Sequence, residues 1–408
     1  MNNSQQAISD SKNYGPPLAV LTTLFFMWGS ITSLNDILIP HLKSLFELNY
    51  AQAMFIQFCF FAAYFIMSIP SGKLIERYGY RAGIIIGLIV TGIGCLLFLP
   101  ASWLVSYPLF LLAFFTLASG ITLLQVAANP YVAILGPPET ASSRLNLSQA
   151  LNSLGTTIAP LIGTWLILEN TIGDAASRAE SVQGPYIVLA LVLFLLAVLI
   201  NYAHLPAVEA ETTRMADFLG EEEHASAWEY PHLVLGSVAI FLYVGAEVSI
   251  GSFLVNFLSE PTIGNFTEAQ AGHYVPFYWG GAMIGRFVGS AILQKVRADR
   301  VLAFNCVATI ILVLITILTS GPVAMWSIIL VGLFNSIMFA NIFTLAVDGL
   351  GQHTGQASGI LCMAIVGGAV VPVLQGFLAD AVGIHTSFML AIFCYAYILF
   401  YALKGFRK

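Results

Sequence analysis

The sequence predicts an all-α membrane protein with twelve transmembrane helices arranged in two six-helix bundles. Hydrophobic residues make up 58% of the 408 positions and charged residues only 9%, whereas a soluble domain carries about 25% charged residues. The charges gather in short clusters between apolar stretches that are long enough to cross a bilayer. One long polar interruption near the middle of the chain divides these stretches into two sets of six.

Each apolar stretch is expected to form one membrane-spanning helix, because about 20 apolar residues match the thickness of the hydrocarbon core. The first stretch follows a polar tail, 1–16, and is too long for the hydrophobic region of a cleavable signal peptide. In order, the stretches run near 17–40, 50–71, 80–100, 106–134, 143–168, 185–205, 231–258, 268–292, 299–320, 323–348, 355–380 and 385–404.

The polar interruption is expected to be a solvated linker, 206–230, between an N-terminal bundle, 17–205, and a C-terminal bundle, 231–404. A short tail, 405–408, closes the chain. The linker is strongly acidic, with Arg214 as its one basic residue apart from histidine. Its carboxylates are Glu209, Glu211, Asp217, Glu221, Glu222, Glu223 and Glu229.

The placement of Lys and Arg predicts the orientation, because basic residues collect in cytoplasmic loops. If both termini are cytoplasmic, only Lys43 and Arg178 fall in loops on the opposite side. The basic clusters that then share the cytoplasmic side are Lys73, Arg77 and Arg81; Lys295, Arg297 and Arg300; and Lys404, Arg407 and Lys408. We therefore expect both termini and the acidic linker to lie inside.

Two short loops in corresponding places indicate that the halves are an internal repeat. Residues 72–81 follow the second stretch and residues 289–300 follow the eighth, and each begins with a glycine and continues into a basic and acidic hinge. Any short cytoplasmic loop tends to be basic, but that does not explain the paired glycines. We predict a gating role for Gly72, Glu76, Arg77 and Arg81 of the first loop. For Arg286 we predict a gating role between the halves or an ion pair with a loop.

Two carboxylates inside apolar stretches are the candidates for coupling transport to a cation. Asp36 lies in the first stretch, where an aspartate at the helix centre costs about 2.5–3.5 kcal/mol on insertion scales. Helix packing does not require a carboxylate, so Asp36 is predicted to bind the coupling cation. Glu247, in the seventh stretch, is the second candidate; it could also line a cavity or lie solvated at its mouth.

Further polar side chains within the stretches predict a binding site for a neutral, polyhydroxylated solute. Gln125 and Asn129 are four residues apart, and Gln149 and Asn152 are three apart, so each pair shares a helix face. An amide both donates and accepts hydrogen bonds, as a sugar hydroxyl does. The cationic side chains expected for a phosphate or carboxylate substrate are missing. The predicted substrate-binding residues are Ser33, Asn35, Gln57, Gln125, Asn129, Gln149, Asn152, Glu247, Asn256, Tyr278, Asn335 and Asn341.

Structural roles compete with this interpretation for several of these residues. Asn and Gln in membrane helices often serve only to hold helices together. Asn129 precedes Pro130, so its amide could satisfy backbone groups that the proline leaves unpaired. Tyr278 could be a packing residue or an anchor at the membrane surface.

Several function classes find no support in the sequence. No basic patch indicates a nucleic-acid partner. No pair among the five cysteines has C-x-x-C spacing, so neither a disulfide scaffold nor a metal site on cysteines is predicted, and no cofactor is expected beyond the coupling ion. A polytopic enzyme or receptor is the rival class, but no H-E-x-x-H motif or comparable catalytic cluster occurs. Proton-driven efflux of sugars or drugs stays open, because the direction of transport cannot be read from sequence.

The motifs resemble those of a known family. Residues 72–81 resemble the G-x-L-x-D-R-x-G-R-R/K loop of the major facilitator superfamily, with Glu76 at the position of the Asp. Within that superfamily the chain resembles the fucose:proton symporter family, and in particular its bacterial glucose/galactose transporter branch. The segments that carry this second resemblance are 34–40, 127–132, 144–153 and 243–247.

The resemblance implies a cation-driven importer of glucose/galactose-type sugars that works by alternating access as a monomer in the bacterial inner membrane. Asp36 matches an aspartate linked to proton movement and sugar recognition in the fucose symporter. Gln125 stands where that symporter has a Glu, and Glu247 stands where it has a Gln. Gln125 cannot titrate, which puts a proton relay between two carboxylates of the first half in doubt. The second carboxylate, Glu247, lies in the other half.

The resemblance also leaves the coupling ion open between a proton and sodium. Some relatives in the glucose branch are coupled to sodium, and Asp36 with Asn35, Ser33 or Thr32 and backbone oxygens could form a sodium site. Ser33, Gln149 and Asn152 match positions that line the sugar cavity. Symport of fucose or another sugar with a proton is the alternative function.

Overall fold

The computed structural model describes residues 15–48, 50–163, 182–202 and 226–407. Within these ranges the chain is helical and contains no strand, which confirms the predicted all-α fold. Nearly all of the predicted tail, 1–16, and most of the predicted linker lie outside the described residues, so the domain boundaries stay predictions.

The first half holds six predicted crossings. Its second and third crossings, which together carry the label α2, are two helices joined at Gly79, where the backbone is not helical and φ is 85° and ψ is 163°. Glycine tolerates this positive φ without steric cost. The elements are α1 (Gly15–Leu45), α2 (Tyr50–Trp103), α3 (Tyr107–Ile134), η1 (Pro138–Thr140), α4 (Ala141–Gly163) and α6 (Gln183–Tyr202).

The second half is more interrupted, because its last three crossings are each built from several helical pieces. The predicted stretch at 268–292 also divides into a short surface helix and a crossing that begins only at Val275. The elements are η3 (Ala227–Glu229), α8 (Pro231–Ser259), α9 (Glu268–Gly272), α10 (Val275–Ile292), α11 (Ala298–Leu318), α12 (Gly321–Asn335), α13 (Met338–Val347), η4 (Gly351–His353), α14 (Thr354–Met363), η5 (Ala364–Val366), α15 (Gly367–Val382), α16 (Ile384–Ser387), α17 (Met389–Phe400) and η6 (Tyr401–Gly405).

Local sequence explains where many of these helices begin and end. A proline lies in the first turn of α3, α8, α10 and α12, where its missing N–H costs nothing. At the other end of α3, the Arg144 guanidinium donates hydrogen bonds to the carbonyls of Val132, Ala133 and Pro137. These bonds satisfy carbonyls that the end of the helix would otherwise leave unpaired.

Twelve crossings follow from these elements. Nine segments of the described chain are long and apolar enough to cross a membrane. One of them, Phe58–Trp103, covers both arms of α2 and therefore crosses twice. The remaining two crossings are α4 and α10, which are less apolar than the others and pack against each other across the two halves. Several of their polar side chains are thus buried against protein, among them Ser143, Asn146 and Ser290.

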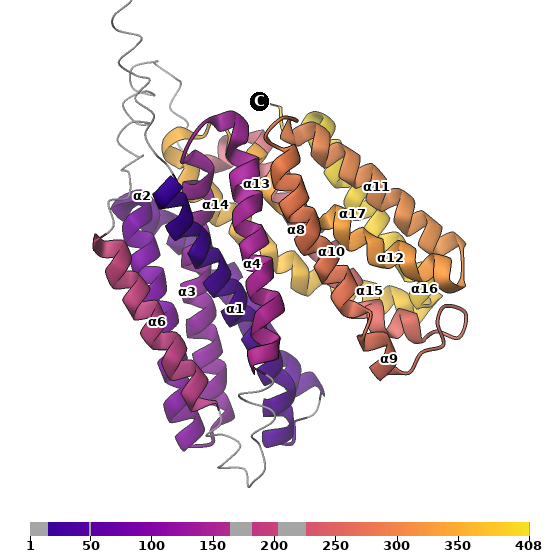
Figure 1. Ribbon diagram of the computed structural model, residues 1–408, viewed down its shortest axis with the longest axis horizontal. Coiled ribbons are helices and arrows are strands. Elements are labelled where there is room, and N and C mark those ends of the chain that lie inside the picture. The colour runs from indigo at the N-terminus through magenta and orange to yellow at the C-terminus, as the bar shows by residue number, and fades with distance from the viewer. Residues whose placement is uncertain (1–14, 49, 164–181, 203–225, 408) are drawn as a thin grey trace, which may run out of the picture.

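The two halves form separate bundles that approach each other at one end of the molecule and diverge toward the other (Figure 1). We call the first end the linker end; Ser226–Tyr230 and η6 lie there, whereas α9 and the turn at Gly383 lie at the opposite, outer end. The bundles meet mainly where α2 packs against α14 and where α4 packs against α10.

Small residues let α2 and α14 approach closely at the linker end. A Cβ added to Gly72 would lie 2.9 Å from the Gly355 carbonyl oxygen, and one added to Gly359 would lie 2.7 Å from the Ser68 carbonyl oxygen. Any side chain at these positions would push the two helices apart. Gly72 lies against α14 of the other half, whereas its counterpart Gly289 lies against Ile337 in its own half, so the two glycines make different contacts.

The loop after the second crossing extends this contact. The Glu76 carboxylate accepts a hydrogen bond of 3.1 Å from the Gln356 backbone N–H at the start of α14. Arg77 instead lies 5.3 Å from the Tyr78 ring centroid, and Arg81 donates to the Asn201 carbonyl within the first half. Of the predicted gating residues in this loop, Gly72 and Glu76 are the ones whose contacts cross between the halves.

Polar contacts between α4 and the second half complete the closed linker end. The Ser143 hydroxyl donates to the Ser290 carbonyl at 2.7 Å, and the Ser290 hydroxyl donates to the Ser143 carbonyl at 3.0 Å. Nearby, the hydroxyls of Ser142 and Thr344 are hydrogen-bonded to each other. These bonds replace contacts with water that each half would make if the linker end opened.

The Gly359→Ala substitution is expected to open the linker end. The added Cβ overpacks the α2–α14 contact, and overpacking costs about 1–3 kcal/mol, enough to shift a two-state equilibrium about tenfold. Spin labels at the exposed positions Lys73 and Lys295, in opposite halves, should report a longer mean distance by pulsed electron resonance. Gly280→Ala is the matched control, because its Cβ would meet no atom within 4 Å. An unchanged distance in Gly359→Ala would show that close approach does not govern closure.

Candidate functional site

The candidate site lies between the two bundles and contains an ion pair. Arg286 of α10 places its Nη2 3.6 Å from Glu247 Oε1 of α8, and these side chains are only 14% and 12% exposed. A charge within a membrane helix bundle is expensive unless it is paired. The pairing neutralises both groups, so this pair adds no net charge to the interface.

Arg286 also joins the two halves. Its Nε donates a hydrogen bond of 3.1 Å to the Ser336 carbonyl, at the interruption between α12 and α13, and its Nη1 donates to the Ser153 hydroxyl on α4. The fork of a guanidinium suits three such partners at once. The sequence predicted a gating contact between the halves or an ion pair in a loop for Arg286. Its ion pair with Glu247 lies within the second half, and its hydrogen bond to Ser153 is the contact that reaches the first half.

Tyr278 and Asn335 support this pair from within the second half. The Tyr278 ring is fully buried; its hydroxyl donates to the Glu247 backbone carbonyl at 3.1 Å and accepts from Asn335 Nδ2 at 3.1 Å. Both residues therefore hold α8, α10 and α12 together in this conformation. The Tyr243 hydroxyl, one turn before Glu247 on α8, is buried without a hydrogen-bond partner in the described part of the chain.

One face of α4 supplies a line of polar side chains toward the second half. Asn146 Nδ2 donates to Asn341 Oδ1 at 3.1 Å, Ser153 accepts from Arg286, and Thr157 lies against Met283. Asn146 and Ser153 are seven residues apart and Ser153 and Thr157 are four apart, which places all three on one face. Gln149 falls on the same face between Asn146 and Ser153, is half-buried, and makes no side-chain hydrogen bond to the described residues.

Two predicted residues face the neighbouring helix of their own half. Asn152 Nδ2 donates to the Phe25 carbonyl at 3.0 Å, and the Ser33 hydroxyl donates to the Thr156 carbonyl at 3.0 Å. Both bonds join α1 to α4. This is the role of holding helices together that competed with substrate binding for any single polar residue.

The remaining predicted residues fall into three groups. Gln125 on α3 is half-buried and donates to the Tyr64 hydroxyl at 2.6 Å, whereas Asn129, one turn closer to the linker end, is fully buried. Asn256 is exposed near the outer end of α8. The side chains of Asn35, Asp36 and Gln57 lie outside the described residues, so their predicted roles, including a sodium site at Asp36, stay predictions.

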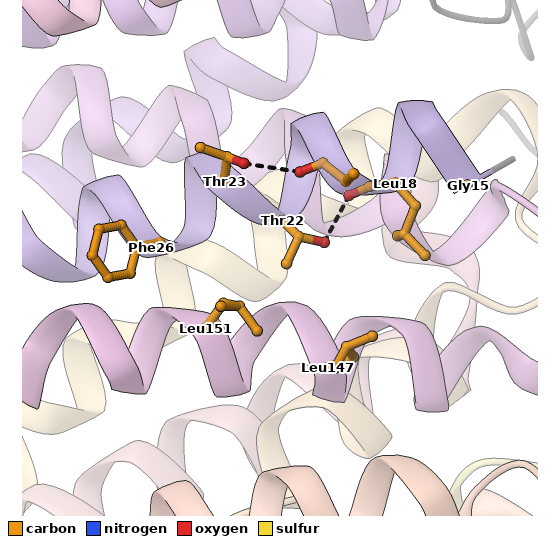
Figure 2. Close-up of a pocket in the computed structure, with 8 residues that line it drawn as sticks. Gly15, Leu18, Thr22, Thr23, Phe26, Leu147 and Leu151 are labelled. Carbon is orange, nitrogen blue, oxygen red and sulfur yellow. Dashed lines mark hydrogen bonds between the residues drawn. The ribbon is translucent and has the colours of Figure 1, made fainter.

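A groove on the first half is a different feature from this site. It has a volume of about 510 Å³ and lies between the start of α1 and α4, as Figure 2 shows. Its two hydroxyls bond back to their own helix, Thr22 to the Leu18 carbonyl and Thr23 to the Ala19 carbonyl. The lining is therefore mainly apolar and includes none of the predicted site residues; it consists of Gly15, Leu18, Ala19, Thr22, Thr23, Phe26, Leu147 and Leu151.

Several residues of the interface were not predicted from the sequence. Ser153, Ser143 and Ser290 make hydrogen bonds across the interface, and Tyr64 accepts one from Gln125 within the first half. A serine costs little in a membrane helix because it can bond to its own backbone. Only the position of the opposite helix distinguishes these serines from the many that bond to their own helix.

Comparison with known proteins gives a consistent result. Residues 20–365 match the family model of the Major Facilitator Superfamily. A glucose/galactose transporter of Brucella abortus (strain 9-941) is 58% identical over 398 residues, covering 97% of this chain and 96% of the relative. The L-fucose-proton symporter of Escherichia coli (strain K12) is 34% identical over 415 residues, covering 96% and 93%.

A solved structure gives the same picture. The structure of FucP in the outward conformation superposes with a TM-score of 0.87 at 32% sequence identity, covering 97% of this chain and 100% of that one. The likeness extends over both bundles and therefore includes the way the halves are placed relative to each other.

The Glu247–Arg286 pair is expected to be energetically coupled. Arg286→Gln or Glu247→Gln alone leaves a mostly buried charge without its partner and should lower the free energy of unfolding by about 3–5 kcal/mol. The double substitution should lose less than the sum of the two, by about 1–3 kcal/mol. Unfolding of the protein in detergent micelles, followed by intrinsic fluorescence, measures all four corners of the cycle.

The control for this cycle is Arg297→Gln. Arg297 forms an exposed ion pair with Asp299 in the loop after α10, so its loss should change stability by less than about 0.5 kcal/mol. Strictly additive effects of the two substitutions at Glu247 and Arg286 would contradict the assignment of the pair.

Proposed function

The chain belongs to the Major Facilitator Superfamily, and on this basis we propose that it is a cation-coupled hexose symporter that imports glucose/galactose-type sugars by alternating access. The observation that carries the proposal is the polar face of α4 opposite a neutralised Arg286. Amides and hydroxyls there match the hydroxyls of a sugar, and the paired arginine offers no free cation to an anionic substrate.

The named relatives support the same substrate class. The Brucella abortus relative is a glucose/galactose transporter and the Escherichia coli relative is an L-fucose-proton symporter. The first is the more similar, so hexoses of the glucose and galactose type are the proposed substrates. Fucose taken up with a proton is the second candidate, because the more distant relative covers nearly the whole chain.

We propose that the linker end is cytoplasmic, so that the conformation described here is open toward the outside. Basic residues gather at that end, in the loops after the second and eighth crossings and after the last one, as the positive-inside rule requires. The match to FucP in the outward conformation supports the same orientation. The membrane is then the bacterial inner membrane, with both termini cytoplasmic, and we expect a monomer.

The cycle follows from this orientation. A sugar and the coupling cation enter from the outer side, and the cation neutralises Asp36, which removes a charge that would be costly to enclose. The halves then rock about the site, separate the glycine contact of α2 and α14, and release the sugar inside. Coupling requires that each ligand raises the affinity for the other by the same factor.

Glu247 has a role in this transport cycle that differs from that of Asp36. It is held by Arg286 in the present conformation, and any movement of α4 away from α10 removes Ser153 from the same guanidinium. We propose that Glu247 and Arg286 sense the relative position of the halves while Asp36 carries the coupling ion, which is sodium or a proton.

Uptake of radiolabelled glucose by proteoliposomes is the test of the function. An inward gradient of the coupling ion should drive accumulation, and sodium and proton gradients are imposed separately to identify the ion. Stimulation by sodium alone assigns a sodium site at Asp36, whereas stimulation by protons alone makes Asp36 the proton carrier. If neither gradient drives glucose uptake, the glucose assignment falls, and fucose and other hexoses are the next substrates to measure.

Asp36→Asn should abolish uphill accumulation while leaving exchange of sugar across the membrane. The amide keeps the size of the carboxyl but can neither titrate nor supply a negative charge to a cation. Accumulation against a gradient should therefore fall at least about tenfold, with counterflow of labelled glucose measured in the same vesicles. Accumulation at the wild-type level in Asp36→Asn would remove the assignment of coupling to this residue.

A further inference from the structure

Asn129 is a fully buried amide that forms no hydrogen bond with the residues that the structure describes. It lies on α3, is 0% exposed, and neither its Nδ2 nor its Oδ1 finds a partner in the described part of the chain. An amide can form up to four hydrogen bonds, and buried polar groups are nearly always paired. The closed linker end therefore holds this side chain in an unfavourable environment.

The proline that follows does not explain the amide. Pro130 has no N–H, so the Val126 carbonyl one turn earlier lacks its helical donor. If Asn129 served the proline kink, its amide would fill this gap. The donor to the Val126 carbonyl is instead the Ser358 hydroxyl, at 2.8 Å, which comes from α14 in the other half.

The unpaired amide and the freed carbonyl are thus covered by the same helix. Ser358 and Cys362 of α14 are both fully buried, and the Cys362 thiol adjoins the Asn129 amide. A thiol is only a weak donor and a weak acceptor, so it does not replace a proper partner. When the halves separate at the linker end, α14 withdraws, and both polar groups of α3 become accessible.

Asn129 continues the amide row of the sugar site toward the linker end. It lies four residues after Gln125 and so on the same face of α3. Gln125 is half-buried and donates a hydrogen bond to Tyr64. In the present conformation its side chain is therefore partly accessible, unlike that of Asn129. Asn129 is one turn closer to the side at which the sugar must leave.

We propose that Asn129 and the Val126 carbonyl form a second, exit-side contact for the sugar, which α14 covers in this conformation and uncovers when the linker end opens. This proposal rests on the proposed function for the identity of the sugar, but the covering by α14 does not. A hexose leaving the central site would exchange Gln125 for Asn129, one helical turn along α3. The unpaired amide also disfavours the closed linker end and so favours its opening.

Native Cys362 reports the uncovering without any sugar. Labelling with N-ethylmaleimide, read for the Cys362 peptide by mass spectrometry, proceeds only when α14 leaves α3. Asn129→Leu and Asn129→Ala remove the unpaired amide from the closed interface, so labelling should slow about fivefold. Ser358→Ala removes the cross-half hydrogen bond and should accelerate labelling to a similar extent. Unchanged or faster labelling in both Asn129 variants overturns the covering of this amide by α14.

The sugar contact is tested by the KM for glucose from each side, in right-side-out and inside-out membrane vesicles. Asn129→Leu should raise the KM about fivefold for glucose entering from the linker end and leave the KM from the outer side unchanged. Gln125→Leu is the matched comparison on the same helix face and should raise the KM from both sides.

The outcomes separate the two proposals. An equal change from both sides, or no change, in Asn129→Leu shows that the patch takes only water and overturns the sugar contact. Wild-type vesicles that carry no glucose in either orientation overturn the proposed function and remove the sugar from this site. In that case the labelling of Cys362 still decides whether α14 uncovers Asn129.

Discussion

A polar group within a bilayer must find its partner inside the protein, and in this chain many of those partners lie across the interface between the two bundles. The helices α4 and α10 are less apolar than most crossings, and they are the pair that meets there. Ser143 and Ser290 exchange hydrogen bonds, and Asn146 bonds to Asn341. The interface therefore satisfies the same side chains that make these two helices poorly suited to face lipid.

The second contact between the bundles, between α2 and α14, depends on small residues more than on hydrogen bonds. Glycines at 72, 355 and 359 allow backbones of α2 and α14 to approach without interposed side chains. Such a contact is tight but contributes few directional bonds, apart from Glu76 at the start of α14. A small rotation of one bundle can thus separate α2 from α14, while the α4–α10 bonds exchange one by one with water. Both properties suit an interface that must open and close repeatedly.

In the described part of the chain, few charged side chains lie at the interface between the two bundles. Glu247 and Arg286 neutralise each other, and the other polar groups described there are amides and hydroxyls. A neutral sugar can exchange hydrogen bonds with such groups without the large desolvation cost of moving an ion.

The sequence by itself determined the class, the number of crossings and the division into two halves, because the apolar period and its interruptions reflect the local requirement for a bilayer. It also singled out Glu247 and Arg286, since charges in membrane helices are rare. It did not determine which polar residues face which helix. Asn152 bonds to α1 whereas Asn146, six residues earlier, bonds to the other half.

The tertiary structure decided these roles because a polar side chain in a membrane helix is cheap or costly only in relation to its neighbours. Ser358 looked like any serine, yet it serves the carbonyl that Pro130 frees in the opposite bundle. For Asn129 the sequence left open a role as partner of that same carbonyl, yet its amide has no hydrogen-bond partner among the described residues. Composition shows that polar groups lie within the membrane, but the packing of helices distant in the chain decides which of them find a hydrogen-bond partner.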